Sequence, residues 1–448
     1  MKGTTTIISY IMLIVMILSA VSCRNNQNRK PTEAEITDSY VYLLGRTLAV
    51  RQELMDFNKG ELPYNTIKYN EAGKADFVNP NLDVAYMEAW FAIDENSAII
   101  LNVPEIKNRY YTVQLLDGWG EVLVNINERN FPYHPFGKFA LCLDNTKAKI
   151  PTDAVKVIMP VKKIKMLARV ELQNTWNKAI ALQKEFKATV IGTPFIEPAI
   201  QFPMFTNEEL PDINVFKVMN ELVKTPDTKF AKADSVQDIC KKVATYITES
   251  EANADSVKKI IRTKSIPTFM SYYLSKEGKF ENGWLAGLYF GEYNGNFWIR
   301  TAANFVGIWA NSPKEAIYFG GWQDSDGQPL GRGETYLLHF DKDKLPAKSV
   351  DAYWSVILVR YPDYRVVPNE LNKFNFNNYS DLVYEKDGSL NIYISPKYNK
   401  EWHKSNWLPS PSEQEFMLTL RMYVPKDNVR AGEWFPPAIT KLEKPNHQ

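Results

Sequence analysis

The run that decides the fold class is Arg109-Tyr110-Tyr111-Thr112-Val113-Gln114-Leu115-Leu116-Asp117. Polar and apolar side chains alternate along it, so residues 110, 112 and 114 share one face and residues 111, 113 and 115 share the other. A period of two is typical of a β-strand with one face in a core. We therefore predict a strand here whose second face is polar enough to line a cleft.

Similar short runs continue on both sides of this strand. Residues 84–93, 98–103, 122–126, 139–143 and 155–158 predict one all-β unit, and residues 336–340, 353–359, 390–394 and 416–424 predict a second. Aspartate, asparagine and glycine stand between them, as turns require. With 11 Trp, 24 Tyr and 23 Phe, the composition also favours β-sandwiches.

Helical spacing of apolar residues appears in other segments. Residues 32–58 show it, as do residues 163–190 and 207–275. We therefore predict a mainly β protein with helical segments, in which two β-sandwich domains accompany a small helical portion. The expected division is a signal peptide at 1–22, a tether at 23–31, a helical lead-in at 32–78, a first sandwich at 79–162, a helical connector at 163–290 and a second sandwich at 291–448.

The N-terminus predicts export and a membrane anchor. Lys2 precedes an apolar run over residues 7–20 that is too short to read comfortably as a membrane span. The following Ala20-Val21-Ser22-Cys23 resembles the lipobox of a bacterial lipoprotein signal, which implies cleavage before Cys23 and a lipid on that cysteine. An uncleaved signal anchor is the alternative. Because Arg24 is not an acidic retention residue, the resemblance implies a lipid-anchored envelope protein of the outer membrane.

Composition excludes other classes of function. The 448 residues are 45% hydrophobic and 23% charged, which is ordinary for a globular chain of two or three domains. Because 53 basic residues nearly balance 52 acidic ones, no nucleic-acid partner is expected. Apart from Cys23, the chain contains only Cys142 and Cys240, which we predict to be buried free thiols rather than a disulfide.

Ordered blocks of sequence resemble a known pair of domains. Asn79-Pro80-Asn81-Leu82-Asp83-Val84-Ala85-Tyr86 and the run 109–117 are similar to signature blocks of the domain of unknown function DUF1254. Five later blocks resemble its usual partner, DUF1214, and they cover residues 324–330, 336–340, 351–355, 406–411 and 432–437. The resemblance implies a helical portion and two β-sandwiches, the C-terminal one jelly-roll-like. It implies no reaction, because fold alone does not deliver function.

Two stretches depart from the usual pattern of that family. Val84 stands where a threonine is usual, and residues 369–374 read Asn-Glu-Leu-Asn-Lys-Phe where an arginine and a tyrosine are usual at the end. A site that used that hydroxyl or guanidinium would be altered in this chain.

Motifs of common enzyme classes are absent from the sequence. There is no Gly-x-Ser-x-Gly elbow, His-Glu-x-x-His, phosphate-binding glycine loop or Cys-x-x-Cys pair, so no cofactor and no metal site are predicted. Four histidines occur, of which His339 lies on the outward side of its predicted strand. The Asp324-Ser325-Asp326-Gly327 stretch predicts a hairpin turn rather than a calcium loop.

Candidate site residues follow from these patterns. Asn81 and Asp83, two residues apart at a strand entry, project to one side and could hold hydroxyls, a cation or a moving proton. Equally, they could satisfy local backbone groups. Further ligand candidates, each of which could instead seal a sandwich, are Tyr110, Gln114, Trp354, Arg360, Asn369, Asn406, Trp407 and Arg421.

Three functions remain open at this point. The first is an extracytoplasmic lipoprotein that binds a small polar or glycan-like ligand in a cleft between the sandwiches. The second is a hydrolase or lyase with Asp83 and either Asp117 or Asp351 as acid and base, and with Arg109 stabilising negative charge. The third is a structural role in the envelope, which predicts no polar pocket.

Overall fold

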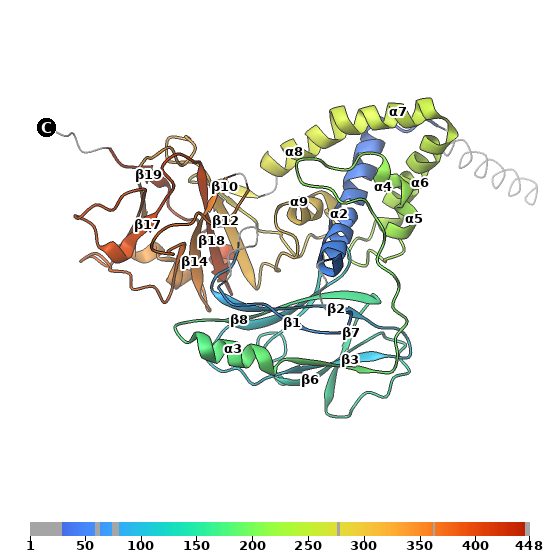
Figure 1. Ribbon diagram of the computed structural model, residues 1–448, viewed down its shortest axis with the longest axis horizontal. Coiled ribbons are helices and arrows are strands. Elements are labelled where there is room, and N and C mark those ends of the chain that lie inside the picture. The colour runs from blue at the N-terminus through green and yellow to red at the C-terminus, as the bar shows by residue number, and fades with distance from the viewer. Residues whose placement is uncertain (1–28, 59–62, 74–79, 276–277, 362, 444–448) are drawn as a thin grey trace, which may run out of the picture.

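The computed structural model describes residues 29–58, 63–73, 80–275, 278–361 and 363–443. Cys23 and the signal segment therefore lie outside the described residues. Within the described part there are four β-sheets, which pair into two sandwiches, and a unit of helices beside them (Figure 1). The prediction of a mainly β chain with two sandwiches and a helical portion is confirmed.

The first sandwich has sheets of five and four strands. The five-stranded sheet has the order β1 (Lys68–Tyr69), β2 (Val84–Ala92), β8 (Lys163–Glu171), β4 (Tyr111–Leu116) and β5 (Val122–Ile126). The four-stranded sheet has the order β7 (Ala154–Ile158), β6 (Gly137–Cys142), β3 (Ala98–Val103) and β9 (Lys187–Ile191). Helix α3 (Trp176–Glu185) connects β8 to β9. Tyr111, Val113 and Leu115 are buried in the core between the sheets, as the alternation predicts.

The predicted boundary at residue 162 is corrected by two of these strands. Residues 163–190 were assigned to a helical connector, but β8 lies between β2 and β4 in the middle of the first sheet. Ile164, Met166, Ala168 and Val170 point into the core at a spacing of two. The sandwich therefore continues to the end of β9, and only α3 is helical in this segment.

The second sandwich also has two sheets. One has the order β10 (Lys279–Glu281), β11 (Trp284–Ala286), β12 (Ala316–Gly321), β18 (Phe416–Tyr423), β14 (Trp354–Arg360) and β15 (Asn375–Asn377). The other has the order β17 (Trp407–Pro409), β16 (Leu390–Ser395), β13 (Tyr336–Phe340) and β19 (Ile439–Lys441). Short helical turns connect these strands: η2 (Lys342–Lys344), η3 (Pro346–Ser349), η4 (Lys404–Asn406) and α10 (Asp427–Arg430). The unit begins before the expected residue 291, because β10 and β11 already belong to it.

The helical unit is assembled around one buried helix, α2 (Glu33–Asn58), whose residues from Tyr40 to Val50 are all buried. The helices beside it are α4 (Asn214–Lys217), α5 (Met219–Leu222), α6 (Ala233–Glu249), α7 (Glu251–Ile260), η1 (Ile261–Ser265), α8 (Ile266–Ser275) and α9 (Phe297–Val306). A helix that is apolar on most sides requires this covering. The expected lead-in and connector are thus one packed unit.

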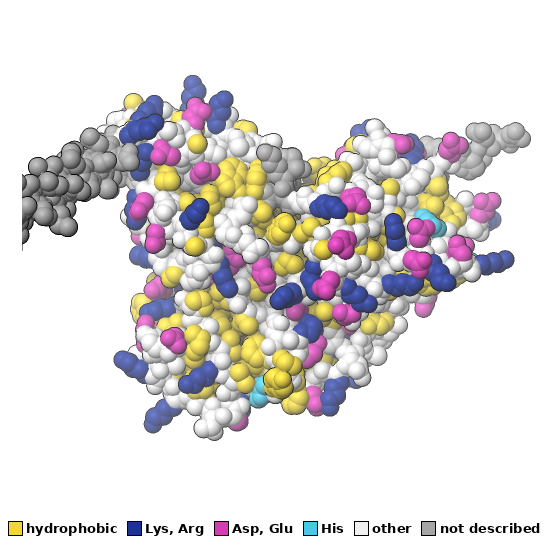
Figure 2. Space-filling view, turned by 180° about the vertical axis from the view of Figure 1, so that it is seen from behind, with side chains coloured by type: hydrophobic (Ala, Val, Ile, Leu, Met, Phe, Trp, Pro, Cys, Tyr) yellow, Lys and Arg dark blue, Asp and Glu magenta, His cyan; other side chains and the backbone are white. Residues whose placement is uncertain are grey.

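Other features of the described residues agree with the sequence. Cys142 and Cys240 are buried free thiols, as predicted. On the face shown in Figure 2, basic and acidic side chains are interspersed. No helix in the described ranges combines the length and the apolar character needed to cross a membrane.

Close packing of α2 on α9 depends on Gly45. The Thr301 hydroxyl of α9 donates to the Val41 carbonyl at 3.0 Å, and Asn304 donates to the Gly45 carbonyl at 3.1 Å. A Cβ atom added at Gly45 would lie 2.4 Å from Thr301 Oγ1, which is inside contact distance.

We expect Gly45→Ala to lower the free energy of unfolding by about 1–3 kcal/mol, because overpacking outweighs the gain in helix propensity. Gly307→Ala is the matched control, since its Cβ would meet nothing within 4 Å. Urea denaturation of both variants measures the difference. Equal stability of the two variants would contradict the close-packing argument.

Candidate functional site

The two sandwiches meet through the outer faces of their larger sheets. Tyr110 at the start of β4 packs against Tyr353 and Tyr423 of the second sandwich, with ring centroids 5.8 and 5.3 Å apart. Asn81 donates from Nδ2 to the Tyr423 hydroxyl at 2.6 Å. These contacts bury polar side chains from both domains, and the pocket described next lies at this junction.

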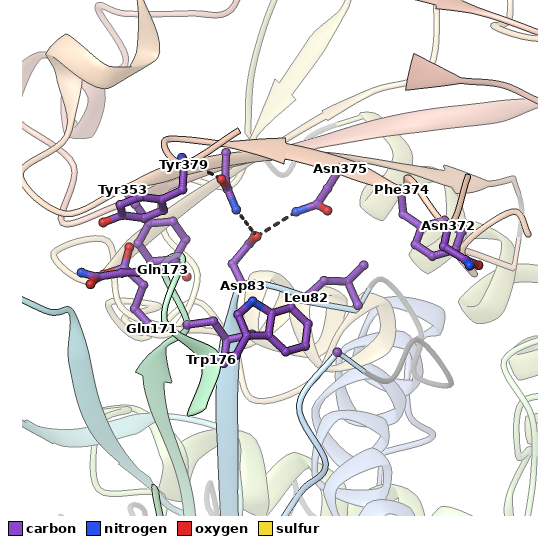
Figure 3. A pocket seen from close by; sticks show the side chains of 13 residues that line it. Leu82, Asp83, Glu171, Gln173, Trp176, Tyr353, Asn372, Phe374, Asn375 and Tyr379 are labelled. Carbon is purple, nitrogen blue, oxygen red and sulfur yellow. Dashed lines mark hydrogen bonds between the residues drawn. The ribbon is translucent and has the colours of Figure 1, made fainter. Parts of the chain in front are cut away.

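The pocket has a volume of about 380 Å³ and is built from both domains (Figure 3). The first sandwich contributes residues at the start of β2, at the end of β8 and at the start of α3. The second contributes residues around β15 and before β14. The described residues that line it are Gly73, Leu82, Asp83, Glu171, Leu172, Gln173, Trp176, Tyr353, Asn372, Phe374, Asn375, Asn377 and Tyr379.

Asp83 is clamped across the domain junction by two amides. Its Oδ1 accepts from Nδ2 of Asn375 at 2.8 Å and of Asn377 at 2.7 Å, as Figure 3 shows. Its backbone N–H donates to Oδ1 of Asn81 at 2.9 Å, which fixes the turn into β2. Oδ2 is buried and accepts no hydrogen bond of good geometry. Burial raises the pKa of Asp83, although nearby Ser355, Asn377 and Arg421 oppose the shift.

Glu171 is the second buried carboxyl group of the pocket. Its Oε2 accepts from the Tyr110 backbone N–H at 3.1 Å and from Gln173 Nε2 at 3.2 Å. Its Oε1 is buried without a well-formed hydrogen bond. Burial raises the pKa of Glu171, while the hydrogen bond from Tyr110 opposes the rise. The Ser355 hydroxyl interacts with Asp83 and the Tyr379 hydroxyl with Glu171, which also opposes the rise in each pKa. Two carboxyl groups that line one pocket therefore each have one buried oxygen without a hydrogen bond of good geometry.

Trp176 forms an aromatic wall at the mouth of the pocket. Its side chain is 46% exposed, and a Cβ atom added at Gly73 would lie 2.7 Å from the indole ring. The indole ring of Trp176 can therefore occupy this position only because residue 73 has no side chain. A half-exposed ring beside buried acceptors offers a ligand both a stacking surface and polar anchors.

Several residues that the sequence singled out lie at or near this junction. Asp83 lines the pocket, whereas Asn81 and Tyr110 are buried behind it, with the Tyr110 hydroxyl donating to Glu315 at 3.1 Å. Arg109 donates to the backbone carbonyls of Glu171 and Leu172, so it holds the chain that carries Glu171. Arg421 is buried on β18, where its charge opposes the rise in the pKa of Asp83.

Other candidates are bonded elsewhere in the fold. Gln114 donates to the Ala310 carbonyl at 2.6 Å, and Trp354 is buried in the core of the second sandwich. Asn406 bonds the Val383 carbonyl at 2.7 Å. Trp407 lies on β17 of the other sheet and donates to the Ser395 carbonyl at 3.0 Å. The structure therefore brings Asn81, Asp83 and Tyr110 together, and it places Trp407 apart from them.

The remaining candidates are also bonded locally. Arg360 pairs with Asp363, and Asn369 bonds the Lys373 carbonyl at 2.9 Å. Asp351 is exposed and 3.8 Å from Lys426. His339 on the outer face of β13 lies 2.6 Å from Asn391 Oδ1. In the expected turn, Asp324 Oδ1 accepts from the backbone N–H groups of Asp326 and Gln328.

Asp117 belongs to a separate buried cluster between the first sandwich and the helical unit. Its Oδ1 accepts from the backbone N–H groups of Trp119 and Glu121 at 2.8 and 3.0 Å. Arg300 binds Asp227 with two hydrogen bonds of 2.8 and 2.7 Å and lies 3.4 Å from Glu121. Burial raises the pKa of Asp117 to about 6 and that of Glu121 to about 7, while Arg300 opposes both shifts.

Sequence reasoning missed most of the pocket: Glu171, Gln173, Trp176, Asn375, Asn377 and Tyr379. Glu171 lay in the segment that was assigned to a helix. The alternation Asn375-Phe376-Asn377 is a strand signal that could have placed the two amides on one face, since Phe376 is buried in the core.

The comparisons with known proteins identify two domains in the chain. Residues 63–190 match the family model described as "Protein of unknown function (DUF1254)", and residues 315–427 match the model described as "Protein of unknown function (DUF1214)". The chain therefore carries these two domains, in the N- to C-terminal order that the signature blocks predicted.

A solved structure shares this architecture. The VPA0106 protein from Vibrio parahaemolyticus matches with a TM-score of 0.67 at 17% identity, over 92% of this chain and 100% of that chain, which shows a common fold. A putative uncharacterized protein from Burkholderia cenocepacia has a TM-score of 0.43 at 11% identity, over 90% of this chain and 87% of that chain. No curated protein matches the chain.

The chemistry of the pocket is that of hydrogen-bond acceptors beside aromatic rings. In the described ranges, no group of three histidine, cysteine, aspartate or glutamate side chains is placed to hold a metal ion. Asp83 and Glu171 can accept hydrogen bonds when ionised and donate one each when protonated. The pocket can thus bind a polar molecule or exchange a proton with it.

The cluster around Asp117 predicts a pH dependence of stability. In the folded protein Glu121 titrates at about 7 rather than near 4.5, so the unfolded chain releases this proton first as the pH rises. Its contribution to stability is complete below about pH 4.5 and is lost as the pH rises through about 7.

We expect Glu121→Gln, which mimics the protonated carboxyl group, to match the wild type near pH 5 and to exceed its unfolding free energy by roughly 1–3 kcal/mol near pH 8. Urea denaturation at both pH values measures this, with Asp144→Asn at an exposed position as the control. A variant that is less stable than the wild type near pH 8 would show that ionised Glu121 stabilises the fold.

Proposed function

We propose that this protein is an envelope lipoprotein that binds a small, polar, glycan-like ligand in the pocket between its two sandwiches. The observation that carries the proposal is the pair of buried carboxyl oxygens, Asp83 Oδ2 and Glu171 Oε1, which line one pocket without a well-formed hydrogen bond. Buried polar atoms in proteins are nearly always satisfied, and leaving one unsatisfied costs about 1–3 kcal/mol. A ligand that donates hydrogen bonds would recover this cost.

Aromatic side chains support a ligand with an apolar face. Trp176, Phe374 and Tyr379 line the same pocket as the two acids. Rings of this kind stack on the apolar face of a sugar or of another flat molecule while polar groups fix its orientation. A volume of about 380 Å³ suits a ligand of one or two rings.

Binding is favoured over the two other functions that the sequence left open. The described lining residues include no histidine, cysteine, serine, threonine or lysine, so the nucleophiles in this set are limited to carboxylates and the hydroxyls of Tyr353 and Tyr379. A purely structural role in the envelope would not require a pocket in which two buried acids lie beside aromatic rings. Acid–base chemistry by Asp83 and Glu171 would in any case begin with binding in this pocket.

The proposed location rests on the N-terminal sequence. The Ala20-Val21-Ser22-Cys23 run follows an apolar segment and precedes a polar one. A lipid on Cys23 would anchor the chain, because each buried methylene contributes about 0.8 kcal/mol. We therefore propose a lipid-anchored protein of the bacterial envelope, with the sandwiches outside the cytoplasm.

A thermal-shift screen of the full chain in detergent against mono- and disaccharides, polyols, organic acids and divalent cations tests the ligand proposal. A ligand at about 100 times its Kd adds roughly 2.7 kcal/mol of stability and raises the Tm. We expect a saccharide or polyol to raise the Tm, and we expect Trp176→Ala to abolish the shift. Trp407→Ala, which removes a tryptophan outside the pocket, is the matched control. A screen with no shift from any compound would refute the proposal.

The anchor has its own test. We expect Cys23→Ser to carry no acyl chains, because the variant lacks the sulfur to which they would be attached. Metabolic labelling with a radioactive fatty acid should mark the wild type and not the variant. Cys142→Ser is the control, since that thiol is buried and would not be acylated. Label retained in Cys23→Ser would exclude lipidation at Cys23.

A further inference from the structure

We infer that the ligand of this pocket is a small organic amine that binds as its ammonium ion. The inference rests on the proposed function, because it specifies the chemistry of the molecule in the same pocket. Three observations carry it: the charge of the lining side chains, the state of their hydrogen-bond donors and the aromatic walls.

The first observation concerns charge. Asp83 and Glu171 are the two ionisable acids of the described lining, and no lysine, arginine or histidine lies among the described residues of that wall. Both acids are nearly fully buried, at 5% and 3% exposure. Arg421 lowers the pKa of Asp83 and Arg109 lowers that of Glu171, but neither arginine belongs to the described lining. Burying a carboxylate is costly, so further positive charge on the pocket side would be favourable. A cationic ligand would supply that charge.

The second observation concerns hydrogen-bond donors. The lining amides are already used within the protein, since Asn375 and Asn377 donate to Asp83 Oδ1. Gln173 donates from Nε2 to the Asn108 carbonyl at 3.0 Å and to Glu171 at 3.2 Å. The hydroxyls of Ser355 and Tyr379 interact with Asp83 and Glu171, respectively. Asp83 Oδ2 and Glu171 Oε1 still lack a hydrogen bond of good geometry. An ammonium group has three donors and no acceptor, so it matches this surface better than a hydroxyl, which has one donor.

The third observation concerns the walls. Trp176, Phe374, Tyr353 and Tyr379 present aromatic rings to the same volume as the carboxyl groups (Figure 3). Such rings attract cations through their faces, and they also cover the apolar body that carries the amine. Acidic side chains and aromatic rings together are a combination suited to an amine on a ring-sized body, whether that body is a sugar or an arene.

Matched pairs of probes test the inference on the full chain in detergent by calorimetry near neutral pH. Glucosamine is compared with glucose, and benzylamine with benzyl alcohol, so that each pair differs only in the amine and the two pairs separate sugar from aromatic bodies. We expect the amine of at least one pair to bind about tenfold or more tightly than its alcohol, because charge-assisted hydrogen bonds are roughly twice as strong as neutral ones. We expect this preference to shrink at acid pH as the carboxyl groups become protonated.

The double substitution Asp83→Asn and Glu171→Gln keeps the shape of the pocket and removes both charges. We expect it to abolish the preference for the amine while any binding of the neutral partner persists. Asp144→Asn, at an exposed position outside the pocket, controls for the change in net charge. Circular dichroism establishes that the double variant is folded; if it is not, the pH dependence of the wild type provides the same comparison.

The other outcomes each overturn a stated claim. Equal affinity for amine and alcohol would refute the amine inference and leave the proposed binding function in place. Saturable binding of calcium, with no binding of either amine, would make the two carboxyl groups a metal site instead. If neither pair, nor calcium, nor any compound of the saccharide panel binds, the proposed function itself fails.

Discussion

Everything at the domain junction follows from one constraint, which is that polar groups buried between two sheets need partners. The outer faces of the larger sheets carry tyrosine, arginine, amide and carboxyl side chains. These two faces pack against each other where the sandwiches meet. Some of the groups find a partner in the other domain: Glu315 accepts from the Tyr110 hydroxyl, and Arg129 pairs with Glu315 at 2.7 Å. Arg169 is bonded within its own sandwich, where it donates to Gln114 at 2.8 Å. The junction is therefore held by specific polar contacts, and an error in the placement of either domain would leave several groups unsatisfied.

The two carboxyl groups of the pocket are held in place through one oxygen each. Asp83 receives two amide hydrogen bonds from β15 on one oxygen, and Glu171 receives a backbone N–H on one oxygen, so both carboxyl groups are held in place by half of their acceptors. The other oxygen of each group is buried beside the pocket without a hydrogen bond of good geometry. Fixing a group through one oxygen while leaving the other available is how a binding site obtains rigidity without losing its capacity to bind.

The sequence predicted the architecture better than the site. Alternation at 109–117 and at 336–340 reports which side chains face a core, because a strand on the surface of a sandwich has one wet and one dry face. The same rule applies to β8, where four apolar residues alternate, but the helical spacing of the residues after it led to a helical assignment. The segment is a strand because β8 is hydrogen-bonded to β2 and β4. Pairing between segments far apart in the chain has no local sequence signature.

The site was only partly predictable for a related reason. Asp83 could be singled out because an Asn-x-Asp sequence at a strand entry is a local signal. Its partners Asn375 and Asn377 are almost 300 residues away along the chain. Nothing in the sequence around these two asparagines indicates that they bind an aspartate. Trp407 is the opposite case. Its sequence block is distinctive and made it a ligand candidate, but its indole N–H donates to Ser395 and so joins β17 to the neighbouring strand. A distinctive residue can thus be structural, while the functional neighbourhood is created by packing.

The kind of partner given to Asp83 bears on what the pocket is for. Had the protein placed an arginine against both oxygens, the carboxylate would be neutralised and its pKa lowered, as in a structural ion pair. The amides of Asn375 and Asn377 instead orient the group. Burial outweighs the opposing charge of Arg421, so the pKa of Asp83 rises. Stability alone would favour an apolar residue at such a position, since replacing buried charges by apolar groups is often neutral or stabilising. A carboxyl group that is oriented but not neutralised is better explained by a donor that arrives from outside the protein.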